Sequence, residues 1–251
     1  MGRFYPKVMR FRELSALYHQ PLFDLMSQSR AVHVRHWRGE EVQRCSLLSI
    51  KTGGCSEDCA YCAQSAHYST GIEREELLSL EEVMTAAHRA RSQGATRFCM
   101  GAAWRSVRDG SEKFERVLEI VREVSRLGME VCVTLGEIGS MEAHKLKAAG
   151  VTAYNHNLDT SPEFYPEIVS TLTFQDRLGT IAAVRESGMS VCCGGIRLSR
   201  EGQALCFFAG ANSIFYGDKL LTAKNPTADV DVALLRELGL DVESRIIPNA
   251  K

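Results

Sequence analysis

The feature that most constrains the fold of this sequence is a repeated unit, in which an amphipathic helical segment ends at a glycine and a short apolar segment follows. Glycine often ends a helix because it readily adopts the left-handed conformation of a C-cap. Alternating helices and strands predict right-handed crossovers and a parallel sheet. The helix-ending glycines are Gly94, Gly128, Gly150, Gly188 and Gly210. The expected strands cover 47–54, 95–101, 129–136, 151–159, 189–196 and 211–217.

Reactive or polar residues occur at the ends of most of these strands. Such groups at the carboxyl ends of successive strands favour an α/β fold of the (β/α) TIM-barrel type over an open doubly wound sheet. About six strands are expected instead of the usual eight, so the barrel is predicted to be incomplete. We expect a single domain over 1–251 with an N-terminal helical extension over 1–45. The strand-end residues are Cys99, Cys132, Asn157, Asp159 and Cys192.

Composition and charge exclude several classes of protein. The chain is 45% hydrophobic and 24% charged, the balance of a folded globular protein. Its 30 Lys and Arg against 31 Asp and Glu leave no excess of positive charge for binding a nucleic-acid backbone. No apolar run is long enough to cross a bilayer, and the first residues lack the apolar segment of a secretory signal. We therefore expect a cytoplasmic protein with neither a membrane nor a nucleic-acid partner.

The nine cysteines are unusual for such a chain. Their odd number and the lack of a secretory signal argue against a disulfide framework and favour metal binding. Cys55, Cys59 and Cys62 lie together just after the first predicted strand. Three thiolates can hold an iron–sulfur cluster with one iron left open. His67 is close enough to serve as a fourth ligand, so zinc remains an alternative.

The spacing C-x3-C-x2-C, with Tyr61 before the last cysteine, resembles the signature of the radical S-adenosylmethionine (radical SAM) family. The resemblance implies that Cys55, Cys59 and Cys62 hold a [4Fe-4S] cluster. It also implies that S-adenosyl-L-methionine binds the open iron, with Tyr61 near the adenine.

Longer segments resemble the biotin synthase family, over roughly residues 46–240: SIKTGGCSEDCAYCAQS, TRFCMGAAW, YNHNLDTSPEFY and CFFAGANSIFYGDKLLT. This resemblance implies sulfur insertion between C6 and C9 of dethiobiotin, an electron donor such as flavodoxin or ferredoxin, and a homodimer. It implies that a second, [2Fe-2S] cluster donates the sulfur. The implied ligands of that cluster are Cys99, Cys132, Cys192 and Arg197. Asn157 and Asp159 are implied to contact S-adenosylmethionine, and Asn155 to lie near the sulfur acceptor.

The residues themselves leave alternatives open. A single cysteine within an apolar strand is often a buried core residue, but three strands with a cysteine at equivalent depth favour ligation. The polar residues after 154 could instead cap the turn before Ser161, and His156 is expected in the core. Cys45, Cys193 and Cys206 match no motif and are interpreted as core or bystander thiols.

The sequence departs from the biotin synthase pattern after Ile196, where RLS follows at once. The family continues there with a glycine-rich loop and two further strand–helix units, so the chain carries an internal deletion. Cys192 and Arg197 then lie five residues apart, although the family places them on different strands. The leading hypothesis is biotin synthesis. The alternatives are a single-cluster radical SAM enzyme, a catalytically impaired remnant, or a zinc-binding scaffold.

Overall fold

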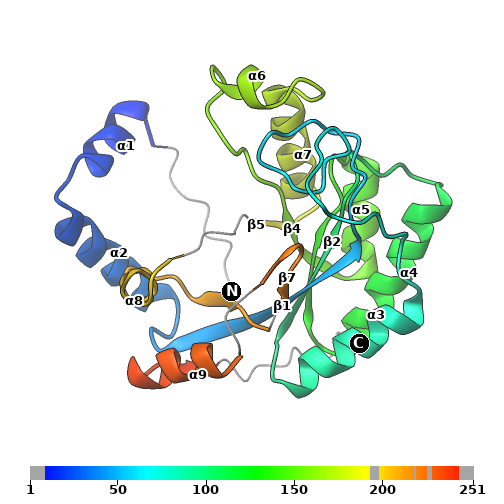
Figure 1. Ribbon diagram of the computed structural model, residues 1–251. Helices are drawn as coiled ribbons and strands as arrows, with labels where there is room; N and C mark the ends of the chain where they lie inside the picture. The colour runs from blue at the N-terminus through cyan, green and yellow to red at the C-terminus, as the bar shows by residue number, and fades with distance from the viewer. Residues whose placement is uncertain (1–8, 193–197, 218, 225–227, 243–251) are drawn as a thin grey trace.

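A sheet of parallel strands forms the centre of the molecule (Figure 1). The computed structural model describes residues 9–192, 198–217, 219–224 and 228–242. Six of the strands run in the order β5-β4-β3-β2-β1-β6, and β9 pairs with the start of β1. These strands are β1 (Glu41–Lys51), β2 (Arg97–Ala102), β3 (Glu130–Thr134), β4 (Val151–Asn155), β5 (Ser190–Cys192), β6 (Ser213–Phe215) and β9 (Asp241–Val242).

Four long helices alternate with the strands and lie on one side of the sheet (Figure 1). They are α3 (Leu80–Ser92), α4 (Glu112–Arg126), α5 (Ser140–Ala149) and α7 (Phe174–Glu186). Both α3 and α7 begin with a capping box, in which Ser79 or Thr173 exchanges hydrogen bonds with an acidic residue three positions later. Because each strand has a period of two, Phe98 and Met100 of β2 face these helices and are almost completely buried.

The opposite face of the sheet carries a separate buried cluster. Its fully buried members are Cys45, Cys99, Cys132 and Ala153, with Cys192 half-buried beside them. These residues are the alternate positions of β1 to β5, so the strand period that buries the outer core also turns the cysteines inward.

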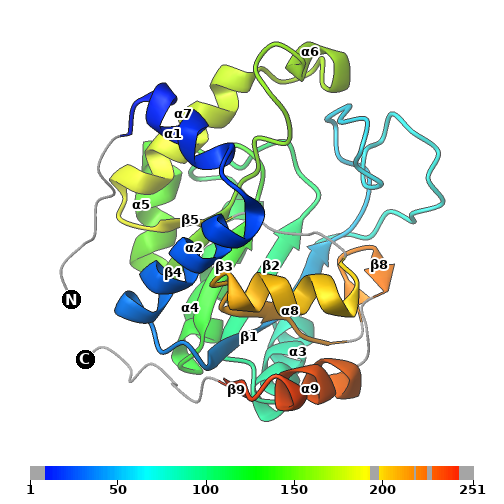
Figure 2. The same ribbon diagram turned by 90° about the vertical axis from the view of Figure 1, so that its left-hand side faces the viewer.

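The N-terminal and C-terminal helices lie away from α4 and α5 (Figures 1 and 2), and those that follow β5 pack through Phe207, Leu234 and Leu235 next to Val42, on the same outer face of the strands as α3. They are α1 (Phe11–Tyr18), α2 (Leu22–His36), α8 (Arg200–Phe208) and α9 (Ala228–Glu237). Ser29 of α2 donates a hydrogen bond of 2.5 Å to the carbonyl of Ala209 at the end of α8. Three short elements complete the described chain: α6 (Tyr165–Ile168), β7 (Lys219–Leu220) and β8 (Ala223–Lys224).

The predicted α/β class and the incomplete (β/α) barrel of about six strands are confirmed. In the described part of the chain β5 and β6 lie at opposite edges of the sheet and do not pair, so six strands form a curled half-barrel. The predicted boundary of the N-terminal extension is wrong, because β1 begins at Glu41 and not near position 47. Residues 41–45 become strand by pairing with β6 and β9, which are distant in sequence. No helix among the described residues is long and apolar enough to span a membrane.

Candidate functional site

Two consecutive glycines turn the chain from β1 into the loop that carries Cys55, Cys59 and Cys62. Gly53 and Gly54 have φ values of 65° and 66°, a left-handed conformation that favours glycine. A Cβ atom on Gly53 would lie 2.9 Å from the carbonyl oxygen of Glu73. This close approach allows the cysteine loop to fold back over the end of the sheet.

The cysteine loop is fastened to the segment between α6 and α7 by Asp58. The Asp58 carboxylate accepts hydrogen bonds from the backbone amides of Ser170 (2.9 Å) and Thr171 (3.2 Å), and from the hydroxyls of both residues. These donors hold the pKa of Asp58 well below its ordinary value. Thr171 also donates to Glu57, and the amide of Ala60 donates to the carbonyl of Ile168.

The three loop thiols are partly protected from solvent and lie near two cations. Cys59 is buried, and Cys55 and Cys62 are half-buried. Burial raises the pKa of Cys55 and of Cys59, whereas the charge of Lys51 opposes this at Cys55 and that of Arg177 at Cys59. The Arg177 guanidinium lies 3.9 Å from the Cys59 sulfur. The site thus combines low polarity with positive charge that favours thiolates.

Tyr61, Asp159 and Arg177 form a polar cluster beside these thiols. The Tyr61 hydroxyl donates to the Asp159 carboxylate, and Arg177 lies 3.5 Å from the same carboxylate. Arg177 also donates to the Tyr165 hydroxyl at 2.8 Å. Asp159 has a left-handed φ of 65°, a strained conformation for a residue other than glycine that directs its carboxylate toward the cluster.

The other two polar residues predicted for this site lie at and just beyond the end of β4. Asn155 is the last residue of β4 and pairs in register with Cys192 of β5. The side-chain oxygen of Asn157 is buried without a hydrogen-bond partner among the described residues. A buried carbonyl oxygen without a donor is costly, so this atom is available to a ligand. His156 is buried and burial lowers its pKa to about 4, as expected for a neutral core histidine.

The three strand cysteines meet below this polar cluster. Cys99 and Cys132 pair in register across β2 and β3. The sulfurs of Cys132 and Cys192 lie 3.3 Å apart. Hydrogen bonding from Cys192 lowers the pKa of Cys132 below its ordinary value. The structure thus brings together the three strand cysteines for which the sequence predicts a ligand role.

Two residues that the sequence interpretation gave no role also lie in this inner cluster. Cys45 of β1 is buried in the same cluster as Cys99, and its nearby thiol contributes to raising the Cys99 pKa. Arg97 of β2 faces the same thiols, and its Nε donates to Glu130 of β3 at 2.8 Å. Their positions follow from strand register and barrel tilt, which no local motif reveals. Arg177 was also missed, because only the contact between α7 and the cysteine loop brings it to the site.

The remaining predicted residues are elsewhere or undescribed. Arg197 and Cys193 lie outside the described residues, and Cys206 is exposed on α8. A ring nitrogen of His67 lies 3.1 Å from the carbonyl of Ser56. In the described ranges, no three His, Cys, Asp or Glu side chains are arranged so that they could hold a single metal ion.

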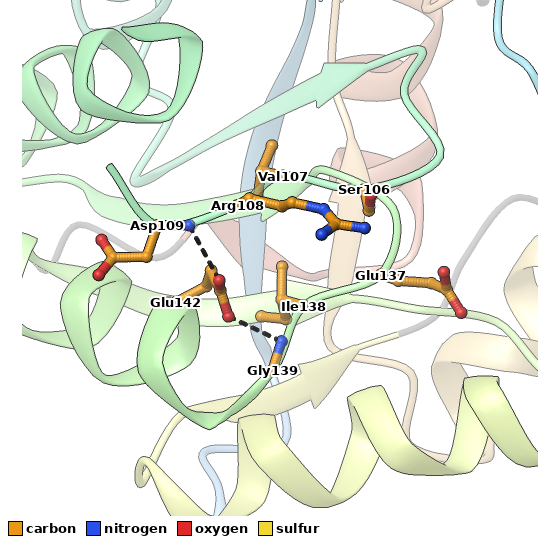
Figure 3. A pocket seen from close by; sticks show the side chains of 8 residues that line it. All are labelled: Ser106, Val107, Arg108, Asp109, Glu137, Ile138, Gly139 and Glu142. Carbon is orange, nitrogen blue, oxygen red and sulfur yellow. Dashed lines mark hydrogen bonds between the residues drawn. The ribbon is translucent and has the colours of Figure 1, made fainter. Parts of the chain in front are cut away.

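A shallow pocket at the ends of β2 and β3 is separate from the cysteines (Figure 3). The Glu142 carboxylate accepts hydrogen bonds from the amides of Asp109 (2.9 Å) and Gly139 (3.0 Å) and so joins the two loops. The residues that line it include no cysteine and no predicted site residue. Its contacts are those of a structural joint between loops.

The donor sets fit iron–sulfur clusters better than isolated ions. A polynuclear cluster binds its thiolates through different irons, so the sulfurs need not surround one point. The outer loop offers three thiols beside two cations, and the inner cluster offers buried thiols beside Arg97. The unpartnered Asn157 oxygen lies in the segment between the two thiol groups.

Family comparisons agree with this arrangement. Residues 49–198 match the Radical SAM superfamily, and residues 162–241 match the Biotin and Thiamin Synthesis associated domain. The chain is 45% identical to the biotin synthase of Methylococcus capsulatus, covering 91% of this chain and 92% of that protein. It is 43% identical to the biotin synthase of Nitrosococcus oceani, covering 92% of this chain and 88% of that protein.

The first of these alignments also supports the internal deletion. It extends over 302 positions, although 91% of the 251 residues is only about 228. About 74 positions of the alignment (302 less 228) therefore have no counterpart in this chain.

Two solved structures share the fold at low sequence identity. The hydrogenase maturase HydG has a TM-score of 0.73 at 13% identity, covering 93% of this chain and 72% of that chain. Methylornithine synthase has a TM-score of 0.69 at 15% identity, covering 92% and 93%.

Proposed function

The chain belongs to the biotin synthase family within the radical SAM superfamily, and from that premise we propose that it converts dethiobiotin to biotin by inserting sulfur between C6 and C9. The observation that carries the proposal is the convergence of Cys99, Cys132 and Cys192 at one buried point, with a 3.3 Å contact between the last two sulfurs. A family member that only generated radicals would have no need for this second group of thiols.

We propose that Cys55, Cys59 and Cys62 hold a [4Fe-4S] cluster, with S-adenosylmethionine beside Tyr61, Asn157 and Asp159. When bound, this pair supplies the radical that removes hydrogen atoms from the substrate. The residues of this chain bind the cluster and S-adenosylmethionine and orient them. Asp58 fixes the cysteine loop, Asp159 and Asn157 offer hydrogen-bond acceptors, and the half-buried loop limits access of water.

The sulfur source is a second, [2Fe-2S] cluster on the inner cysteines in this proposal. The thiols lose their protons on binding iron, and Arg97 offsets part of the resulting negative charge. Asn155, in register with Cys192, lies at the end of β4 where the sulfur acceptor would enter. The family resemblance implies Arg197 as the fourth ligand, a residue that lies outside the described ranges.

Anaerobic reconstitution with iron and sulfide tests the proposal. Mössbauer spectra should show both cluster types, Cys55→Ser should lose the [4Fe-4S] signal, and Cys99→Ser should lose the [2Fe-2S] signal. Loaded protein with dethiobiotin, S-adenosylmethionine and reduced flavodoxin should form 5′-deoxyadenosine and biotin. A chain that loads both clusters and forms no biotin would contradict the proposed reaction.

A second candidate function, radical formation without sulfur insertion, is favoured by one observation. The sheet ends at β5, and about 74 aligned positions of the relatives are missing. A half-barrel encloses the substrate with fewer strands than a closed barrel does. Formation of 5′-deoxyadenosine without biotin would identify this second function.

We propose that the chain is one domain over 1–251 and that a second copy covers the face of α1 and α2. This face exposes large apolar side chains, including Phe11 (86% exposed), Tyr18 (79%) and Phe23 (73%). Such a patch is typical of an interface. Sedimentation should show a dimer that Phe11→Glu with Phe23→Glu dissociates, whereas a monomeric parent chain would contradict this assignment.

A further inference from the structure

Cys45 belongs to the same inner cluster as the three predicted ligands. It lies on β1, whose Leu47 pairs with Cys99, so Cys45 is one inward position below. Its side chain is buried (4% exposed) and belongs to the same contact cluster as Cys99 and Cys132. A fourth strand therefore contributes a thiol to the same point as β2, β3 and β5.

The inner thiols form two adjacent pairs. Cys132 and Cys192 are one pair, with sulfurs 3.3 Å apart. Cys45 and Cys99 are the other, because they lie on the neighbouring strands β1 and β2, one inward position apart, within the same buried cluster. Two thiolates on one tetrahedral metal lie about 3.8 Å apart when metal–sulfur bonds are about 2.3 Å. Two neighbouring pairs are what a two-iron cluster requires, because each iron takes two protein ligands.

Arg97 faces the cluster but is engaged by another partner. Its Nε donates to Glu130 at 2.8 Å, and Nη2 contacts the same carboxylate oxygen. Gln43 also donates to Glu130 at 3.1 Å. A guanidinium held in this way remains charged and serves to balance thiolates, so it does not supply the missing ligand.

We propose that Cys45 is the fourth ligand of the inner cluster, which is then held by four thiolates from β1, β2, β3 and β5. The inference rests on the proposed function, since it assumes an iron–sulfur cluster at this site. It differs from the family resemblance, which assigns the fourth position to Arg197. On this assignment the four thiolates supply two protein ligands to each iron.

The test isolates the inner cluster in the full chain by replacing Cys55, Cys59 and Cys62 with alanine. Oxidised protein loaded with 57Fe should give one Mössbauer quadrupole doublet, because two irons with two thiolates each have equivalent ligands. Cys45→Ser in this background should bind iron at least about tenfold more weakly or give two unequal doublets. Cys206→Ser, which changes an exposed thiol on α8, is the matched control and should leave the spectrum unchanged.

Two further measurements distinguish the loss of a ligand from misfolding of the variant. Circular dichroism of metal-free Cys45→Ser should match that of the parent, and Cys45→Ser in the otherwise unchanged chain should retain its [4Fe-4S] signal, which excludes misfolding. If Cys99→Ser loses the inner cluster and Cys45→Ser keeps the parent spectrum, Cys45 is not a ligand and the inference is overturned. If neither variant affects a loaded cluster, the strand cysteines do not hold that cluster, and the proposed function is contradicted as well.

Discussion

Two buried polar atoms without a partner among the described residues have different consequences. The Asn157 oxygen lies beside the candidate site, where a ligand can donate to it. The Oδ2 atom of Asp231 lies in α9, away from the cysteines and next to the apolar contacts of Leu234 and Leu235. The first atom is expected to bind a ligand, and the second is expected to lower the free energy of unfolding.

Replacing Asn157 with alanine should weaken S-adenosylmethionine binding about tenfold, the effect of losing one well-placed hydrogen bond. Anaerobic equilibrium dialysis with labelled cofactor measures this, with iron content showing that the outer cluster is intact. Gln28→Ala on exposed α2 is the control. Equal affinity in Asn157→Ala and the parent would show that the unpartnered oxygen does not bind the cofactor.

Asp231 should make the protein less stable as pH rises from about 4 to 6. Burial raises its pKa from 3.8 to about 6, so in this interval the folded state keeps a proton that the unfolded state loses. Asp231→Asn should therefore increase the free energy of unfolding at pH 7 by about 2–3 kcal/mol and have little effect at pH 3.5.

Urea unfolding of the metal-free chain at the two pH values checks this. Asp229→Asn, on the exposed side of the same helix, provides the comparison. A gain at pH 7 no larger than that of Asp229→Asn would contradict the role given to Asp231.

At the scale of elements, the cysteine loop depends on its attachment to the segment before α7. Asp58→Ala removes the acceptor for two amides and two hydroxyls of Ser170 and Thr171. A chelator should then extract iron from the outer cluster about tenfold faster, because charged hydrogen bonds of this kind hold the loop closed. Stopped-flow absorbance measures the rate, and Glu81→Ala on α3 is the control; unchanged extraction would mean that Asp58 does not restrain the loop.

The helices, and their alternation with strands along the chain, could be predicted from the sequence because their signals are local. The capping box at Ser79 and the glycine after α5 mark helix ends where the structure places them. The convergence of Cys99, Cys132 and Cys192 followed from strand alternation. These features depend on a few neighbouring residues each.

Contacts between distant elements could not be predicted. Cys45 joins the inner cluster only through the register of β1 with β2, and Arg177 reaches Cys59 only because α7 packs beside the loop. The first six residues of β1 lack a strong apolar pattern and become strand through β6 and β9. Pairing geometry of this kind is set by the whole sheet.

For the whole molecule, the open edge at β5 has a predictable cost. Val191 in this edge strand is 36% exposed, and an unpaired edge can recruit another chain. Val191→Lys should reduce concentration-dependent association, because a charged lysine on an edge strand opposes pairing. Light scattering over a concentration series measures this, with Val230→Lys on α9 as control. Equal association of the parent and Val191→Lys would show that the chains do not associate through β5.

The long first strand also governs the order in which the chain can assemble during synthesis. β1 pairs with β2 about 50 residues later, but its pairing with β6 and β9 waits for residues about 170 and 200 further along. Loop closure over such separations is slow, and a ribosome releases the N-terminal segments first. The five strands from β1 to β5 can therefore pair before the C-terminal helices leave the ribosome. During that interval the edge of β1 that later pairs with β6 is unpaired, so the growing chain is most exposed to association with other chains before β6 is made.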